Sequence, residues 1–169
     1  CNLYNDCTHL LAQAQPNRFI GMAVVPLQEG ARAAQVLEHA IVDLKFRGAF
    51  IGTNVNGQYF NTTQFDPFWA KAEELNAPIY LHPADPVEQY STYGDYNEIK
   101  RATWGWGVET GTHALRMIFG GVFDRFPNLK VCGAHAGGYL PSYAGRSDAV
   151  CVTFPDRCTP GVPKKPPSE

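Results

Sequence analysis

Four apolar runs alternate with helical patterns along this chain, and this alternation constrains the fold more than any other feature. The runs are bounded by turn residues and cover 19–26, 46–55, 77–83 and 130–135. Continuous apolar stretches of this length are typical of strands covered on both faces of a parallel sheet. Amphipathic helices are predicted around them at 2–13, 29–45, 63–76, 104–120 and 140–150. This order predicts right-handed βαβ units and an α/β fold.

The length and charge of the chain limit its class. With 169 residues it has the size of one domain. We predict a domain over residues 1–158 and a proline- and lysine-rich tail or linker over 159–169. The net charge is -2, and the sequence contains neither a basic run nor an apolar run of about 18 residues. We therefore expect no nucleic-acid partner and no membrane partner.

The cysteines and the first residues bear on the compartment. The five cysteines include no Cys-x-x-Cys pair of the kind that binds metals. We interpret them as thiols of a reducing compartment, which predicts a cytoplasmic protein, although Cys151 and Cys158 can close a short loop. The chain opens on Cys1 and a helical pattern follows at once, so it is expected to begin inside an element. The missing signal peptide is then uninformative.

Two histidines stand at the C-terminal ends of neighbouring predicted strands. His82 ends the run 77–83, and His135 ends the run 130–135 just before a glycine-rich turn. Consecutive parallel strands usually lie side by side, so both imidazoles should face the cleft where such sheets bind ligands. An imidazole there can bind a divalent metal or transfer protons near neutral pH.

The alternative for each histidine is a structural role. A lone histidine is more often a buried, hydrogen-bonded residue than a catalytic one. Two histidines do not complete a catalytic metal site, which normally has three protein ligands. Asp85 is the nearest carboxylate to His82, but Pro83 favours an extended path and makes Asp85 a weak candidate ligand. His9 and His113 fall in predicted helices and are interpreted as structural or solvated.

Two further features suggest a binding site at the same strand ends. Asn54 lies at the end of the run 46–55 and is our candidate substrate-binding residue from that strand. The polar connection 84–102 is longer than the usual connection in a compact domain. Loops of this length are usually functional lids or disordered segments.

Ordered motifs along nearly the whole chain resemble one branch of the amidohydrolase-related family. This branch contains aminocarboxymuconate semialdehyde decarboxylase and γ-resorcylate decarboxylase. The matching motifs are Leu81-His82-Pro83, Trp104-Gly105-Trp106, Glu109-Thr110, His113-Ala114-Leu115-Arg116, Gly121-Val122-Phe123-Asp124-Arg125-Phe126-Pro127, Ala134-His135-Ala136-Gly137-Gly138 and Gly145-Arg146-Ser147-Asp148.

The resemblance implies a (β/α)8 TIM-type barrel that uses one divalent metal, zinc or manganese. The four predicted strands would correspond to about the third to the sixth of the full barrel. His82 would be a metal ligand, and His135 would be a catalytic residue beside the metal. Trp104 or Trp106 would lie near the substrate pocket.

The sequence also departs from the family pattern. The remaining family ligands are a His-x-His or Glu-x-His pair on the first strand and an aspartate on the eighth, and the sequence has no matching positions. Family members have about the 250 residues of a complete barrel, so we expect this chain to be an internal fragment. The family's His-Gly-Gly is replaced by His135-Ala136-Gly137, which is expected to crowd the backbone near the site.

The resemblance implies a metal-dependent, non-oxidative decarboxylase (a carboxy-lyase) of a small aromatic or muconate-type carboxylic acid. The expected partner is that small-molecule acid, and a homo-oligomer is a further candidate. One alternative is a hydrolase of the same family that acts on lactones or on C–O or C–N bonds. An alternative of another class is a catalytically dead structural or interaction module. Half a barrel would expose strand edges and apolar faces, which favours association.

Overall fold

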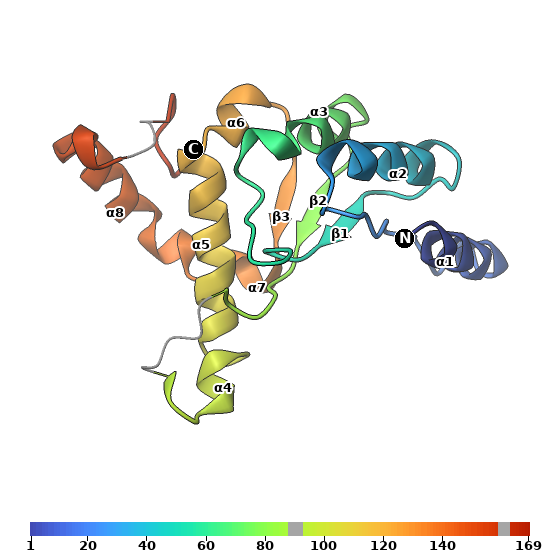
Figure 1. Ribbon diagram of the computed structural model, residues 1–169, viewed down its shortest axis with the longest axis horizontal. Helices are drawn as coiled ribbons and strands as arrows, with labels where there is room; N and C mark the ends of the chain where they lie inside the picture. The colour runs from blue at the N-terminus through green and yellow to red at the C-terminus, as the bar shows by residue number, and fades with distance from the viewer. Residues whose placement is uncertain (88–92, 159–162) are drawn as a thin grey trace. The chain divides into compact units, whose positions relative to one another are not determined.

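The computed structural model describes residues 1–87, 93–158 and 163–169, and Figure 1 traces its elements in chain order. Most predicted helices form, with ends shifted by a few residues: α1 (Asn2–Ala14), α2 (Gly30–Val42), η1 (Thr63–Phe65) followed by α3 (Asp66–Glu74), α5 (Gly105–Phe119) and α8 (Leu140–Thr153). Shorter helices that were not predicted are α4 (Asn97–Lys100), α6 (Val122–Arg125), α7 (Ala134–Gly137) and η3 (Pro155–Arg157).

The strands are shorter than the apolar runs. They are β1 (Ala49–Ile51), β2 (Ile79–Leu81) and β3 (Val131–Gly133), in the order β1-β2-β3. β1 pairs with β2 in parallel, with Phe50 opposite Tyr80, and the N–H of Ile79 donates to the carbonyl of Lys130. The predicted α/β fold with parallel strands is therefore confirmed.

The predicted strand 19–26 is not a regular strand. It meets β1 through a single parallel bridge between Ala23 and Ala49. The N–H of Ala23 donates to Gly48, and the carbonyl of Ala23 accepts from Phe50. Pro26 has no N–H to donate, which explains why the pairing cannot extend along the whole run.

The chain divides into two compact units. The first unit comprises residues 1–51, 62–81 and 126–132, and the second comprises 52–61, 82–125 and 133–169. The chain passes into the second unit immediately after β1, immediately after β2 and within the last residues of β3. The strands thus belong almost entirely to the first unit, and the segments that follow them belong to the second. The domain boundary expected at residue 158 remains a prediction.

The core of the first unit lies between α2, α3 and the strands. α2 and α3 lie side by side (Figure 1). α2 turns the predicted apolar stripe inward, and α3 contributes the large side chains of Phe68 and Trp69, which are fully buried. Burial of aromatic side chains of this size supplies much of the free energy that holds helices on a sheet.

The second unit is arranged along α5, which contacts α6, α7 and α8. At the end of α8, Cys151 forms a disulfide with Cys158, across a Cα–Cα distance of 5.7 Å. The pair therefore closes the short loop that the sequence allowed, whereas Cys1, Cys7 and Cys132 are free and exposed. The interpretation of all five cysteines as thiols was wrong for this pair.

Two further expectations concern loops and membranes. Residues 88–92 of the expected loop 84–102, and residues 159–162 of the tail, lie outside the described residues. The described part of the loop includes α4. Among the described helices, none has the length and apolar character needed to cross a membrane.

Replacing Leu37 with alanine should strongly destabilise the first unit, because Leu37 is fully buried on α2. We expect the free energy of unfolding to fall by about 2–5 kcal/mol, measured by urea denaturation. Val42→Ala on the same helix is the matched control, since Val42 is 46% exposed. Equal losses in the two variants would contradict this account of the core.

Candidate active site

His82 and His135 lie together in the second unit. Their ring centroids are 5.3 Å apart, and the rings meet edge to face at 67°. Nδ1 of His82 lies 3.0 Å from the carbonyl oxygen of Pro83. Because a carbonyl can only accept, this hydrogen bond places the proton on Nδ1 and the lone pair on Nε2. A backbone carbonyl orients metal-binding histidines in the same way.

The sequence predicted that His135 would end a strand, but the structure differs. β3 stops at Gly133, and His135 lies in a turn with left-handed dihedral angles of φ 52° and ψ 49°. Ala136 follows at φ 57°, and the next two glycines also have positive φ. The left-handed turn ends the strand early and leaves the His135 side chain exposed. A non-glycine residue in this region costs about 1 kcal/mol, and such strain is often found at functional sites.

The turn is held against α5 by a close backbone contact. A Cβ atom at Gly138 would overlap the carbonyl oxygen of Gly107, so only glycine fits there. The replacement of a family glycine by Ala136 was expected to crowd the backbone. In the structure, Ala136 instead costs free energy because its backbone adopts the left-handed conformation, with φ 57°.

The segments that follow β1 and β2 are hydrogen-bonded to each other. Thr53 Oγ1 accepts from the N–H of Ala84 at 3.0 Å, and Nδ2 of Asn54 donates to the carbonyl of Asp85 at 3.2 Å. The Asp85 carboxylate accepts from Nε1 of Trp106 at 3.1 Å and lies 3.6 Å from the guanidinium of Arg101. The Asp85 carboxylate is thus engaged by Trp106 and Arg101.

Glu109 on α5 belongs to one of the family-like motifs, but no role in the site was predicted for it. It is 3% exposed, and its oxygens accept from Nδ2 of Asn54 at 3.1 Å and from the Tyr59 hydroxyl at 2.9 Å. A signal was present in the sequence, because Trp106, Glu109 and His113 have the i, i+3, i+7 spacing of one helix face.

His113 is the structural residue that the sequence suggested. It is fully buried, and its Nε2 accepts from the N–H of Phe60 at 3.3 Å. Its Nδ1 has no hydrogen-bond partner among the described residues. Burial, and secondarily the nearby positive charge of Arg116, lowers the pKa of His113 to about 3. The ring is therefore neutral at physiological pH.

The predicted substrate-binding tryptophans take different positions. Trp104 is 47% exposed and its ring packs on Tyr139 with a centroid distance of 4.6 Å. Trp106 is half-buried and bonded to Asp85. The structure thus links Asn54 and Trp106 to the segment that follows His82, whereas Trp104 is partly exposed and packs on Tyr139.

The described residues supply only part of a metal site. Among residues 1–87, 93–158 and 163–169, no three His, Cys, Asp or Glu side chains gather closely enough to hold a metal ion. His82, with its anchored Nδ1, has the chemistry of one ligand. Further ligands would have to come from outside the described residues.

A model of the amidohydrolase family matches residues 1–153. The chain belongs to the amidohydrolase family. Curated relatives include the γ-resorcylate decarboxylase of Rhizobium radiobacter, 36% identical over 151 residues, which cover 85% of this chain and 46% of the relative. The 2-amino-3-carboxymuconate-6-semialdehyde decarboxylase of Dictyostelium discoideum is 35% identical over 164 residues, which cover 96% of this chain and 44% of the relative.

Solved structures agree with this membership. A 5-carboxyvanillate decarboxylase of Novosphingobium aromaticivorans with bound manganese superposes with a TM-score of 0.91 at 32% identity, covering 98% of this chain and 48% of that one. A dihydroxybenzoic acid decarboxylase of Polaromonas with manganese and 2-nitroresorcinol superposes with a TM-score of 0.86 at 33% identity, covering 98% of this chain and 52% of that one. This amidohydrolase chain spans about half the length of the relatives it matches. The predicted partial (β/α)8 barrel is thereby confirmed.

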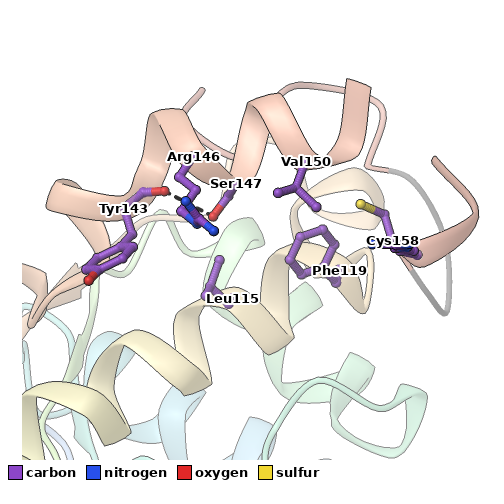
Figure 2. A pocket seen from close by; sticks show the side chains of 8 residues that line it. Leu115, Phe119, Tyr143, Arg146, Ser147, Val150 and Cys158 are labelled. Carbon is purple, nitrogen blue, oxygen red and sulfur yellow. Dashed lines mark hydrogen bonds between the residues drawn. The ribbon is translucent and has the colours of Figure 1, made fainter. Parts of the chain in front are cut away.

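The amidohydrolase chain has a hollow of about 400 Å³ between α5 and α8 (Figure 2). Its lining includes Leu115 and Phe119 from α5, Arg146 and Val150 from α8, and Arg157. Beside it, the Ser147 hydroxyl donates to the carbonyl of Tyr143 at 3.2 Å (Figure 2). No predicted site residue lines this hollow, so it is distinct from the candidate active site.

Ala136→Gly should stabilise the amidohydrolase chain, because glycine adopts the left-handed conformation without strain. We expect the free energy of unfolding to rise by about 0.5–1 kcal/mol, measured by urea denaturation. Ala149→Gly, at an exposed position within α8, is the control and should lower it by about 1 kcal/mol. A loss of stability in Ala136→Gly would contradict the left-handed turn.

His113 should make folding depend on pH. Its folded pKa of about 3 lies below the ordinary value of 6.5, so below pH 6.5 the unfolded chain binds the extra proton. Stability from this group is complete above pH 6.5 and is lost as the pH falls towards 3, by about 1.4 kcal/mol per pH unit. Unfolding measured at pH 6.5 and 4.5 checks this, with His113→Gln as the variant that should lose the slope. An unchanged slope in that variant would refute the assignment.

Proposed function

We propose that the whole protein containing this chain is a metal-dependent, non-oxidative decarboxylase of a small aromatic or muconate-type carboxylic acid. The observation that carries the proposal is the contact between the rings of His82 and His135. It occurs in a chain that is 35–36% identical to decarboxylases named for such acids. Because these relatives are named as decarboxylases, decarboxylation is favoured over hydrolysis or a purely structural role.

His82 would be one protein ligand of the divalent metal. The Pro83 carbonyl fixes its ring and leaves the lone pair on Nε2, the state that a metal ligand requires. Manganese, found in solved relatives, and zinc are the candidate ions. When bound, such an ion supplies Lewis-acid polarisation of a substrate oxygen.

His135 would act on the proton that replaces the carboxylate. Its ring is exposed beside His82, where an imidazole can hold or transfer a proton at neutral pH. The strained turn fixes the backbone from which this ring projects. The position next to a metal ligand is what supports the catalytic assignment.

Asn54, Trp104 and Trp106 would contact the substrate. Nδ2 of Asn54 donates to protein acceptors, so we assign its Oδ1 to a substrate hydroxyl. The partly exposed indole ring of Trp104 suits contact with an aromatic acid. Trp106, whose Nε1 donates to Asp85, would contribute its ring rather than a hydrogen bond.

The compartment and assembly belong to the same proposal. The free, exposed thiols of Cys1, Cys7 and Cys132 support a cytoplasmic location. A homo-oligomer remains our expectation for the whole protein. Size-exclusion chromatography with light scattering measures its mass.

The complete protein should release carbon dioxide from 2,6-dihydroxybenzoate or 5-carboxyvanillate when loaded with Mn²⁺. His82→Ala should weaken metal binding by at least about tenfold, measured by elemental analysis after dialysis. His135→Ala should retain the metal but lower kcat by about 10²- to 10⁴-fold. His39→Ala on α2 is the control for loss of a histidine away from the site.

Three outcomes would overturn the proposal. The first is full metal content and activity in His82→Ala. The second is turnover of lactones but not of carboxylated phenols, which would favour the hydrolase. The third is an absence of any turnover by the metal-loaded complete protein, which would favour a structural module.

A further inference from the structure

One face of α5 makes hydrogen bonds to the segment that follows β1, which carries Asn54, and to the segment that follows β2, which begins at His82. Trp106 Nε1 donates to Asp85, Glu109 accepts from Asn54, and His113 accepts from the backbone of Phe60. We call these three side chains the α5 polar face. All of these groups lie in the second unit. The face therefore anchors the segment after β1 and the segment after β2 to the same helix.

Asn54 connects Glu109 to the segment that begins at His82. Its Nδ2 donates to Glu109 Oε1 at 3.1 Å and to the Asp85 carbonyl at 3.2 Å. Because an amide nitrogen has two hydrogens, these two bonds use its full donor capacity. The Asn54 amide nitrogen is thus held between the Glu109 carboxylate and the backbone three residues after His82.

The burial of Glu109 makes this connection costly to break. Glu109 is almost completely buried, and a buried acceptor that loses its donors keeps the full penalty of removal from water. Thr53 adds a parallel link by accepting from the N–H of Ala84. The conformation of the peptide after His82 therefore depends on hydrogen bonds made by Thr53, Asn54 and Glu109.

We propose that Glu109 is a positioning residue for His82, acting through the Asn54 amide and the backbone of Asp85. The consequence for metal binding rests on the proposed role of His82 as a ligand. The positioning itself does not, because it concerns the conformation of the metal-free chain. Glu109 touches neither His82 nor His135 in the hydrogen bonds described above.

The test follows the His82 ring and its neighbouring amides by NMR in the 15N-labelled chain without metal. Glu109→Ala should shift the His82 ring nitrogen signals and raise hydrogen exchange at Ala84 and Asp85 by about tenfold, the size expected for loss of a hydrogen bond to a carboxylate. Glu109→Gln should restore exchange to within about twofold of the original chain. Its amide oxygen can accept from Asn54, and the Tyr59 hydroxyl can turn to accept from its nitrogen.

A double variant tests the route through Asn54. If Glu109 acts only through Asn54, then Asn54→Ala and Asn54→Ala with Glu109→Ala should give the same exchange at Ala84 and Asp85. Tyr59→Phe is the matched control, since it removes the bond to the other Glu109 oxygen and should change this exchange by less than about twofold.

Additive effects of the two substitutions, equal effects of Glu109→Ala and Glu109→Gln, or unmoved His82 signals would each overturn the proposal. If Glu109→Ala fails to fold, Asn54→Ala decides, because unchanged exchange at Ala84 and Asp85 would overturn the proposal on its own. Failure of the proposed function shows separately, as metal retained in His82→Ala.

Discussion

The second unit depends on a carboxylate buried on α5. Glu109 is 3% exposed and offers two acceptor oxygens. Asn54 and Tyr59, which lie 55 and 50 residues earlier in the chain, donate a hydrogen bond to one oxygen each. A buried carboxylate is tolerated only when donors satisfy it, so the helix and that segment must adopt their structure together. The candidate active site is therefore supported by polar contacts as well as by apolar packing.

Much of the fold follows from local pattern. The helices were predicted because apolar residues recur with a period that one helix face must bury, as at Ala33, Leu37 and Ala40. Three of the four predicted strands form, but each is shorter than the apolar run that predicted it. An apolar run reports burial, whereas a strand also requires each N–H and carbonyl to find a partner, and Pro26 cannot donate one.

The site could be predicted only in part. The two histidines were located because strand ends in a parallel sheet share one edge, but their catalytic roles remain predictions. The left-handed turn at His135 and Ala136 could not be predicted, since a positive φ is uncommon for any residue other than glycine and alanine gives no sign of it. The bonds of Glu109 were missed for another reason: hydrogen-bond partners 50 and 55 residues away leave no periodic trace.

The division of the chain into two units separates the residues that build the strands from the residues of the candidate site. Each strand is built with residues of the first unit, whereas Asn54, His82 and His135 come after the chain has passed into the second. Substitutions in the segments after the strands can therefore alter the candidate site while the residues that pack the core between α2 and α3 stay the same.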